Sequence, residues 1–436
     1  MPAVAYIVRS FPRLSQTFIL NEILALEARG VPLRIFAVTD PREPLVQPQA
    51  AEVLAPVRYL DVIPAEELRA ARLDLARRDP RRYAETVAYV QSRPDLDDGY
   101  TASSRYACLD QAIVLASMLA RSGDVGHLHA HFAHDPALIA LLAHKLTGIP
   151  FSFTAHARDL FQIPRHILVE RAAAATALVT CCGANLAYLD EVLPPELRAR
   201  VQLIHHGVNL EGFRPADRPA PSDSGAAGAG MALRASGEAP SPAGEDAAPL
   251  ILSVGRLVEK KGFPDLLEAC ALLMARGRRF RCAIFGDGPL RTALAAQVER
   301  LGLAGVVELA GERPQRDLVP VFQRADIFAL ASFVTEDGDR DGVPNVLAEA
   351  MACGLPVVST AVAGIPELVR HGANGLLCPA RDVEALAAAL ARLLDDEGER
   401  RAMGAQARRT VVESFDMRAA AARLAGLFAQ PMPVAA

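Results

Sequence analysis

The sequence predicts an α/β protein made of two parallel doubly wound sheets. Strand and helix patterns alternate in both halves of the chain, and a stretch rich in Pro, Ala, Gly and Ser separates the halves. Alternation of this kind is typical of sheets whose ligands bind at the carboxyl ends of the strands. We expect a first domain over residues 1–212, a flexible linker over 213–249, a second domain over 250–412 and a last helix over 413–430.

Composition narrows the class of protein. The chain has 436 residues and a formal net charge of −5, which argues against a nucleic-acid binder. Its seven cysteines show no metal-binding spacing, and two of them are adjacent, so buried free thiols are expected rather than disulfides. No secretory signal or membrane-spanning run is visible, and we expect a cytoplasmic protein.

The first half opens with a strand over residues 4–8, a loop, a helix over 18–29 and a strand over 33–38. The loop residues Ser15, Gln16 and Thr17 are expected to face the ligand-binding edge of the sheet. Capping of the helix by Ser15 or Thr17 is a structural alternative, and both roles can hold together.

A histidine-rich tract follows, with His127, His129 and His131 at every second position. This spacing fits one face of a strand, and we prefer a strand to a metal site because no completing cysteine or acidic cluster is near. His131 and His134 could then line an acceptor side. His156 follows the strand over residues 151–154, where it either reaches the ligand edge or packs as a core histidine.

Residues 65–90 are rich in arginine, and Pro80 is expected to split them into two helices. A solvated helical face is the preferred interpretation. A patch that meets anionic lipid headgroups is the alternative.

The second half repeats the alternation, with glycines after its first two strands. The expected strands are residues 250–254, 280–285, 306–310 and 327–330, and the expected helices are 264–276, 290–301, 315–324, 382–394 and 417–428. We also expect a short helix at Gly364 and a turn at residues 374–375.

Residues 341–360 are predicted to form a loop, a helix, a turn and a strand. Pro344 suits the first helical turn, and Gly354 is placed to end the helix in a left-handed conformation. The helix start offers free N–H groups to an anion. Glu349 lies in the apolar half of the pattern, where a carboxylate needs donors such as a ribose diol. An incidental acid on a surface helix is the alternative.

These motifs together resemble the family 4 retaining glycosyltransferases. The matching segments are Gly255-Arg256-Leu257, Lys261-Gly262-Phe263, Gly286-Asp287-Gly288-Pro289 and residues 341–360. The amino half, with residues 13–18, is similar to enzymes that build bacterial exopolysaccharides of the colanic-acid kind. The resemblance implies two Rossmann-like domains that face each other across a cleft (GT-B), with a last helix that returns to the first domain.

The resemblance also implies roles for residues. Arg256 and Lys261 would clamp the diphosphate without a metal, Glu349 would hold the ribose, and His156 would lie beside the transferred sugar. Asp341, where the family usually has Glu, would face the sugar hydroxyls and act with His156, Arg256 and Lys261 in catalysis. The expected donor-binding set is Gly255, Arg256, Lys261, Gly286, Gly288, Asp341, Gly342, Val343, Pro344, Asn345 and Glu349. The expected acceptor-side set is Ser15, Gln16, Thr17, His131 and His134.

The implied reaction is retaining transfer of a hexose from a nucleotide-diphosphate sugar to a saccharide or polyprenyl-linked acceptor, in exopolysaccharide or cell-envelope glycan synthesis. A UDP-sugar is the expected donor and a GDP-sugar the alternative, with no metal cofactor. The protein would work in the cytoplasm, with contact to the inner membrane face as an option. A sugar-nucleotide 2-epimerase and a non-catalytic sugar-nucleotide-binding protein remain as alternatives.

Overall fold

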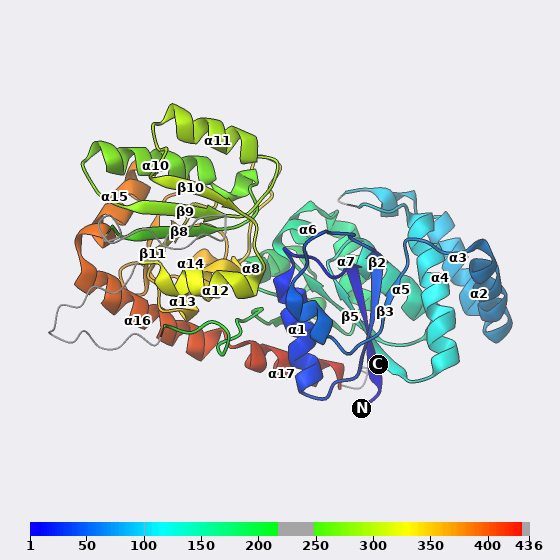
Figure 1. Cartoon of the computed structure of the whole chain (residues 1–436). Coiled ribbons are helices and arrows are strands. Elements are labelled where there is room, and N and C mark those ends of the chain that lie inside the picture. Colours follow the sequence, from blue (N-terminus) through cyan, green and yellow to red (C-terminus); the bar gives the residue numbers. More distant parts are fainter. Residues whose placement is uncertain (100, 217–247, 430–436) are drawn as a thin grey trace. The chain divides into compact units, whose positions relative to one another are not determined.

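The computed structural model describes residues 1–99, 101–216 and 248–429, and these form two compact units (Figure 1). The first unit contains residues 1–207, 336–343 and the chain from Met417 onward. The second contains Val208–Thr335 and Pro344–Asp416. Most of the expected linker, from residue 217 to 247, lies outside the described residues.

The first unit contains a seven-stranded parallel sheet in its described part, with strand order β3-β2-β1-β4-β5-β6-β7. This is the order of dinucleotide-binding sheets, extended by one strand, and the order reverses between β1 and β4. The strands are β1 (Ala3–Ser10), β2 (Leu33–Thr39), β3 (Val57–Tyr59), β4 (Val125–His131), β5 (Phe151–Ala155), β6 (Ala177–Thr180) and β7 (Val201–Leu203).

Helices cover both faces of this sheet. They are α1 (Thr17–Ala28), α2 (Ala65–Arg78), α3 (Pro80–Gln91), α4 (Arg105–Ser122), α5 (Asp135–Thr147), α6 (Ala157–Gln162), α7 (Arg165–Ala174), α8 (Gly183–Val192), α9 (Pro195–Arg198) and α17 (Met417–Phe428), with short 3₁₀ turns η1 (Pro48–Glu52) and η2 (Pro94–Asp97).

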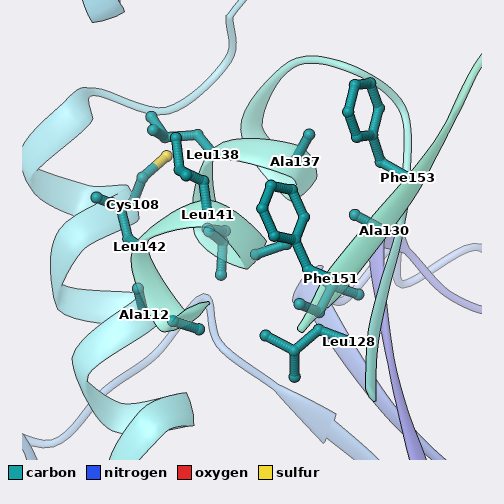
Figure 2. Packing of buried hydrophobic residues seen from close by; sticks show 14 of the residues in the cluster. Cys108, Ala112, Leu128, Ala130, Ala137, Leu138, Leu141, Leu142, Phe151 and Phe153 are labelled. Carbon is teal, nitrogen blue, oxygen red and sulfur yellow. The ribbon is translucent and has the colours of Figure 1, made fainter. Parts of the chain in front are cut away.

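The side chains of strand β4 point alternately to the two faces of the sheet, so one face of the strand is apolar and the other carries histidines. Leu128 and Ala130 point into the core of Figure 2, where side chains of α4, α5 and β5 pack against them. His127, His129 and His131 take the opposite positions and are all buried. The ring of Phe428 in α17 packs on His127 and His129 at centroid distances of 5.3 and 5.0 Å, so the predicted single histidine face is confirmed.

The second unit contains a six-stranded parallel sheet among the described residues, in the order β10-β9-β8-β11-β12-β13. Its strands are β8 (Leu250–Val254), β9 (Arg281–Phe285), β10 (Val307–Gly311), β11 (Ile327–Leu330), β12 (Val357–Thr360) and β13 (Gly375–Cys378). Its helices are η3 (Glu259–Lys261), α10 (Phe263–Ala275), α11 (Arg291–Arg300), α12 (Gln315–Arg324), α13 (Asn345–Ala352), α14 (Ile365–Leu368), α15 (Val383–Asp395) and α16 (Glu397–Ser414). Both sheets are Rossmann-like, which confirms the predicted fold class.

The ends of helices α13 and α1 and the start of strand β13 can be compared with the positions expected from the sequence. Gly354 has φ +80° and follows α13, so its left-handed conformation is confirmed. The expected cap of α1 by Ser15 or Thr17 is wrong, because Gln16 is the N-cap residue and makes no side-chain capping bond. The turn expected at residues 374–375 is only partly right, because β13 starts at Gly375.

The arginine-rich stretch forms α2 and α3, divided before Pro80 as predicted. Four of its arginines pair with carboxylates; the pairs are Arg72–Asp110, Arg78–Asp74, Arg81–Glu85 and Arg82–Asp79. These pairs support the solvated-face interpretation. All seven cysteines are buried, and none of them forms a disulfide, as expected. Within the described ranges, no helix has both the length and the apolar character to cross a membrane.

Candidate active site

The second unit brings two glycine loops into direct contact at the carboxyl ends of β8 and β9. A Cβ atom on Gly286 would lie 1.9 Å from the carbonyl oxygen of Gly255, and Gly286 has φ +143°. The amide of Leu257 donates to the carbonyl of Asp287 at 2.9 Å. The sequence therefore needs glycine here, because only bare backbone lets the loops after these strands pack so closely.

A third glycine, Gly262, places Lys261 over the loop that follows β8. Gly262 has φ +66°, and a Cβ on it would meet the carbonyl oxygen of Ala331 at 1.8 Å. The side chain of Lys261 consequently lies beside Gly255, where a Cβ would be 3.6 Å from its Cδ and Cε atoms. Arg256, next to Gly255, is exposed. Two cationic side chains thus arise from one edge of the sheet, where anions are bound in this type of fold.

Glu349 is a buried carboxylate of the same unit. It lies in α13 with 5% of its surface exposed, and Nε2 of Gln315 donates to its Oε1 at 2.7 Å. Burial raises the pKa of Glu349 to about 7, while the bond from Gln315 opposes the rise. A buried carboxylate is costly unless several donors reach it, and a ribose diol supplies two.

The remaining expected donor residues fall into both units. Asp341, Gly342 and Val343 group with the first unit, whereas Pro344 and Asn345 belong to the second. In the first unit, a Cβ on Gly342 would lie 3.3 Å from Sγ of Cys182 and 3.4 Å from Sγ of Cys181. The guanidinium of Arg340 stacks over the ring of Phe161 at 4.0 Å. Residues 336–343 therefore pack on the first unit.

In the first unit, the backbone of His156 is fixed by Asp159. The carboxylate of Asp159 accepts from the amide of His156 at 3.1 Å and from the amide of Ala133 at 2.5 Å. Burial raises the pKa of Asp159 to about 7, although these backbone bonds oppose the rise. Asp159 thus joins the loops that follow β4 and β5, which is a positioning role.

The ring of His156 belongs to a buried hydrogen-bonded chain. Its Nε2 lies 3.3 Å from Nδ1 of His131, and its Nδ1 lies 3.2 Å from Nε2 of His206. At the far end, Oε1 of Glu22 lies 2.8 Å from Nε2 of His131 and also accepts from the hydroxyl of Tyr6. Burial lowers the pKa of His156 well below its usual range, so its imidazole is neutral at physiological pH.

The expected acceptor-side residues occupy different environments. His131 is fully buried and belongs to the hydrogen-bonded chain of His156. His134 is also buried, and as the N-cap residue of α5 it accepts a hydrogen bond from the amide of Asp135 at 2.8 Å. Ser15 is exposed, while Oε1 of Gln16 is buried and has no hydrogen-bond partner among the described residues. Thr17 is half-buried and is the first residue of α1. Within this set, Ser15, Gln16 and Thr17 remain the side chains with capacity for a polar ligand.

Sequence reasoning misses Glu22, Tyr6, Cys181, His206 and Gln315. Glu22 occupies an ordinary polar position of an amphipathic helix, and no local pattern marks it. His206 carries a usable signal, because His205-His206 follow β7 after one intervening residue, at the same sheet edge as His156. Gln315 starts α12 after β10, and only the tertiary fold brings it to Glu349.

The fold and these loops define a protein with two Rossmann-like units, and the second unit carries two touching glycine loops, two cationic side chains at one sheet edge and a buried carboxylate. Residues 239–410 match the family model described as glycosyl transferases group 1. The resemblance predicted from the sequence is therefore confirmed over these residues.

Relatives and solved structures agree with this assignment. The chain is 42% identical over 178 residues to WcaL of Salmonella typhimurium, a protein named for colanic acid biosynthesis, covering 41% of this chain and 44% of that protein. It is 42% identical over 175 residues to the amylovoran biosynthesis glycosyltransferase AmsK of Erwinia amylovora, covering 40% of this chain and 43% of that protein. The matched part thus spans less than half the length of these curated relatives.

The fold of the whole chain is similar to that of HepE from Anabaena in complex with UDP-glucose. The TM-score is 0.68 at 15% identity, with 98% of this chain and 99% of that chain covered. At this identity the likeness concerns the fold alone, and it confirms the predicted pair of Rossmann-like domains.

Proposed function

We propose that the protein is a retaining glycosyltransferase that moves a hexose from a nucleotide-diphosphate sugar to a saccharide acceptor in exopolysaccharide synthesis. The observation that carries the proposal is the edge of the second sheet, where Lys261 lies over Gly255 and the carboxylate of Glu349 is buried with a hydrogen bond from Gln315. This edge lies within the region that matches the group 1 glycosyltransferases.

The donor would bind with its diphosphate against the backbone amides of the two glycine loops. Lys261 and Arg256 would neutralise the charge that develops on the leaving phosphate, which removes the need for a metal ion. Glu349 would accept hydrogen bonds from the ribose hydroxyls. We propose a UDP-sugar as donor because the similar fold of HepE binds UDP-glucose, with a GDP-sugar as the alternative.

Transfer with retention would proceed on one face of the sugar. The departing phosphate would accept the proton of the acceptor hydroxyl, so no protein carboxylate is required as base. Asp159 is unsuited to such a role because its oxygens already accept from two backbone amides. His156 is neutral, and it would position the sugar rather than carry charge.

The acceptor class is part of the proposal. We propose a growing saccharide carried on a polyprenyl lipid at the cytoplasmic face of the inner membrane, received by the loop of Ser15, Gln16 and Thr17 in the first unit. The relatives named for colanic acid and amylovoran synthesis support a saccharide acceptor. Transfer to lipid-linked saccharide in vesicles, compared with the same saccharide free in solution, tests the lipid part.

Incubation with radiolabelled UDP- and GDP-sugars tests the reaction class. Slow hydrolysis without acceptor, and transfer when a saccharide acceptor is added, are the expected results. Interconversion at C2 of the sugar would show a 2-epimerase instead. Binding without any turnover would show a non-catalytic sugar-nucleotide-binding protein.

A further inference from the structure

A group of two histidines and a cysteine in the first unit has the spacing of a metal site. The atoms that His156, Cys181 and His206 offer as ligands all lie within 4.8 Å of one another. The three residues follow strands β5, β6 and β7 at the same edge of the sheet. We propose that His156 Nδ1, His206 Nε2 and Cys181 Sγ bind one soft divalent cation of the zinc class.

The nitrogen–nitrogen distance is close to the distance that this cation requires. His156 Nδ1 and His206 Nε2 are 3.2 Å apart. A tetrahedral zinc ion, with bonds of about 2.0–2.1 Å to nitrogen and about 2.3 Å to sulfur, separates neighbouring ligand atoms by about 3.3–3.6 Å. Two nitrogens and one sulfur, with a fourth position open to water, form a ligand set that zinc accepts.

The surroundings of His156 hold it in the form that a metal needs. A carboxylate only accepts hydrogen bonds, so the 2.8 Å contact from His131 Nε2 to Glu22 places the proton of His131 on that nitrogen. In the neutral ring of His131, Nδ1 then accepts from Nε2–H of His156 at 3.3 Å. The lone pair of His156 therefore lies on Nδ1, toward His206. Carboxylate-to-histidine relays of this kind orient metal-bound imidazoles.

A second group, Glu22, His129 and His131, also has ligand atoms within 4.8 Å of one another. It is a poorer site because both ring nitrogens of His129 contact hydroxyl groups outside the ligand set, Ser152 at 2.8 Å and Thr154 at 3.1 Å. In the first group, by contrast, His156 Nδ1 contacts its co-ligand His206. Glu22 and His131 bind each other as well. These residues form the support for the first group rather than a second site.

Binding would change protonation in a defined way. The thiol of Cys181 loses its proton to solvent as the metal–sulfur bond forms, and the proton of His206 moves from Nε2 to Nδ1 within the neutral ring. One proton is thus released for each cation bound. The charge of the cation is partly balanced by the new thiolate and by Glu22 behind His131.

The three ligands belong to the first unit, whereas Arg256 and Lys261 belong to the second, and cation binding does not require the proposed transfer. If the proposed function holds, cation binding occupies His156 and should inhibit transfer rather than support it. Metal binding is measured without the transfer reaction. A protein that binds the cation but shows no transfer would therefore contradict the proposed function and leave the metal site supported.

Cobalt(II) is the probe for the test. Metal-depleted full-length protein, kept reduced without added thiols, should bind one equivalent of Co²⁺ with a thiolate-to-cobalt charge-transfer band, and Zn²⁺ should displace it. Cys181→Ser should abolish the band. Cys182→Ser and Cys270→Ser, which remove buried thiols next to the site and in the second unit, should keep it.

Two further variants keep the test decisive if Cys181→Ser does not fold. His206→Gln alters a half-buried ligand and should weaken Co²⁺ binding at least about 10-fold. Glu22→Gln should weaken it about 10- to 100-fold through the relay. Absence of the band in the native protein, a band that persists in Cys181→Ser, or equal affinity in His206→Gln overturns the proposal.

Discussion

Nε2 of Gln315 donates a hydrogen bond of 2.7 Å to Oε1 of Glu349, and this buried contact joins the first residue of α12 to α13. It orients the carboxylate without fully compensating its burial, because the pKa of Glu349 is still raised to about 7. The proposed ribose contact depends on this carboxylate.

Glu349→Gln should weaken nucleotide binding by about 10- to 100-fold, because a charge-assisted hydrogen bond contributes about 1.5–3 kcal/mol. Native affinity for UDP should increase as pH rises through about 7, since the ionised carboxylate is the better acceptor. The variant should lack this increase. Calorimetric titration with UDP from about pH 6 to about pH 8, on either side of that pKa, checks both expectations.

The same carboxylate should affect folding stability with the opposite trend. The pKa of Glu349 is higher in the folded protein than in the unfolded chain. At pH values between these two pKa values, the folded state holds the proton more tightly than the unfolded state does. The free energy of unfolding therefore falls as pH rises toward about 7. Glu349→Gln removes this contribution. The variant should gain stability relative to the native protein as pH rises, as followed by urea unfolding. Asp159, whose pKa is also raised to about 7, is unchanged in both proteins.

Lys261→Ala should weaken binding of the nucleotide diphosphate about 10- to 100-fold by loss of a charged contact to phosphate. Lys260→Ala is the matched control, since it removes the same charge one position earlier and should change binding less than about threefold. Binding of uridine, which has no phosphate, should be similar in both variants. Equal losses in the two variants would mean that general surface charge, not a clamp at Lys261, attracts the nucleotide.

Gly286→Ala should destabilise the second unit by about 2–3 kcal/mol and abolish nucleotide binding, because the new Cβ collides with the carbonyl oxygen of Gly255. Gly302→Ala is the control. Gly302 also has a positive φ, but a Cβ there would meet nothing within 4 Å, so the change should cost about 1–2 kcal/mol and keep binding. Thermal unfolding with and without UDP separates the two effects.

His156→Asn should slow transfer while leaving UDP affinity within about threefold, because His156 belongs to the first unit, whereas the proposed nucleotide contacts Lys261 and Glu349 belong to the second. The pH profile of the native rate should show no limb from His156, whose pKa lies well below its usual range through burial. If the variant unfolds, or loses UDP binding, His156 is a packing residue and its assigned role is wrong.

The sequence predicts more of the second unit than of the first. Glycine loops are recognisable because a close backbone approach, as at Gly255 and Gly286, excludes every other residue. Strand β13 is harder to predict because Gly375 after Asn374 is typical of a turn, yet a Cβ there would lie 2.7 Å from Val357 on the neighbouring strand. Its glycine serves close strand packing, which is a tertiary requirement.

The buried chain from Tyr6 to His206 could not be predicted in the same way. Its members come from five separate segments, and each has an ordinary local explanation. His131 is recognisable by strand alternation, but its partners Glu22 and His156 depend on which strands become neighbours. Pairing of β4 with both β1 and β5 creates the cluster, and sequence patterns do not specify that pairing.

Hydrogen exchange of the full-length protein with and without saturating UDP locates the nucleotide site. We predict slower exchange in peptides that cover residues 255–262, 286–290 and 345–352, with the same peptides unprotected in Lys261→Ala at equal UDP concentration. Protection confined to peptides of the first unit, or no protection in these three segments at saturation, would contradict a nucleotide site at the edge of the second sheet.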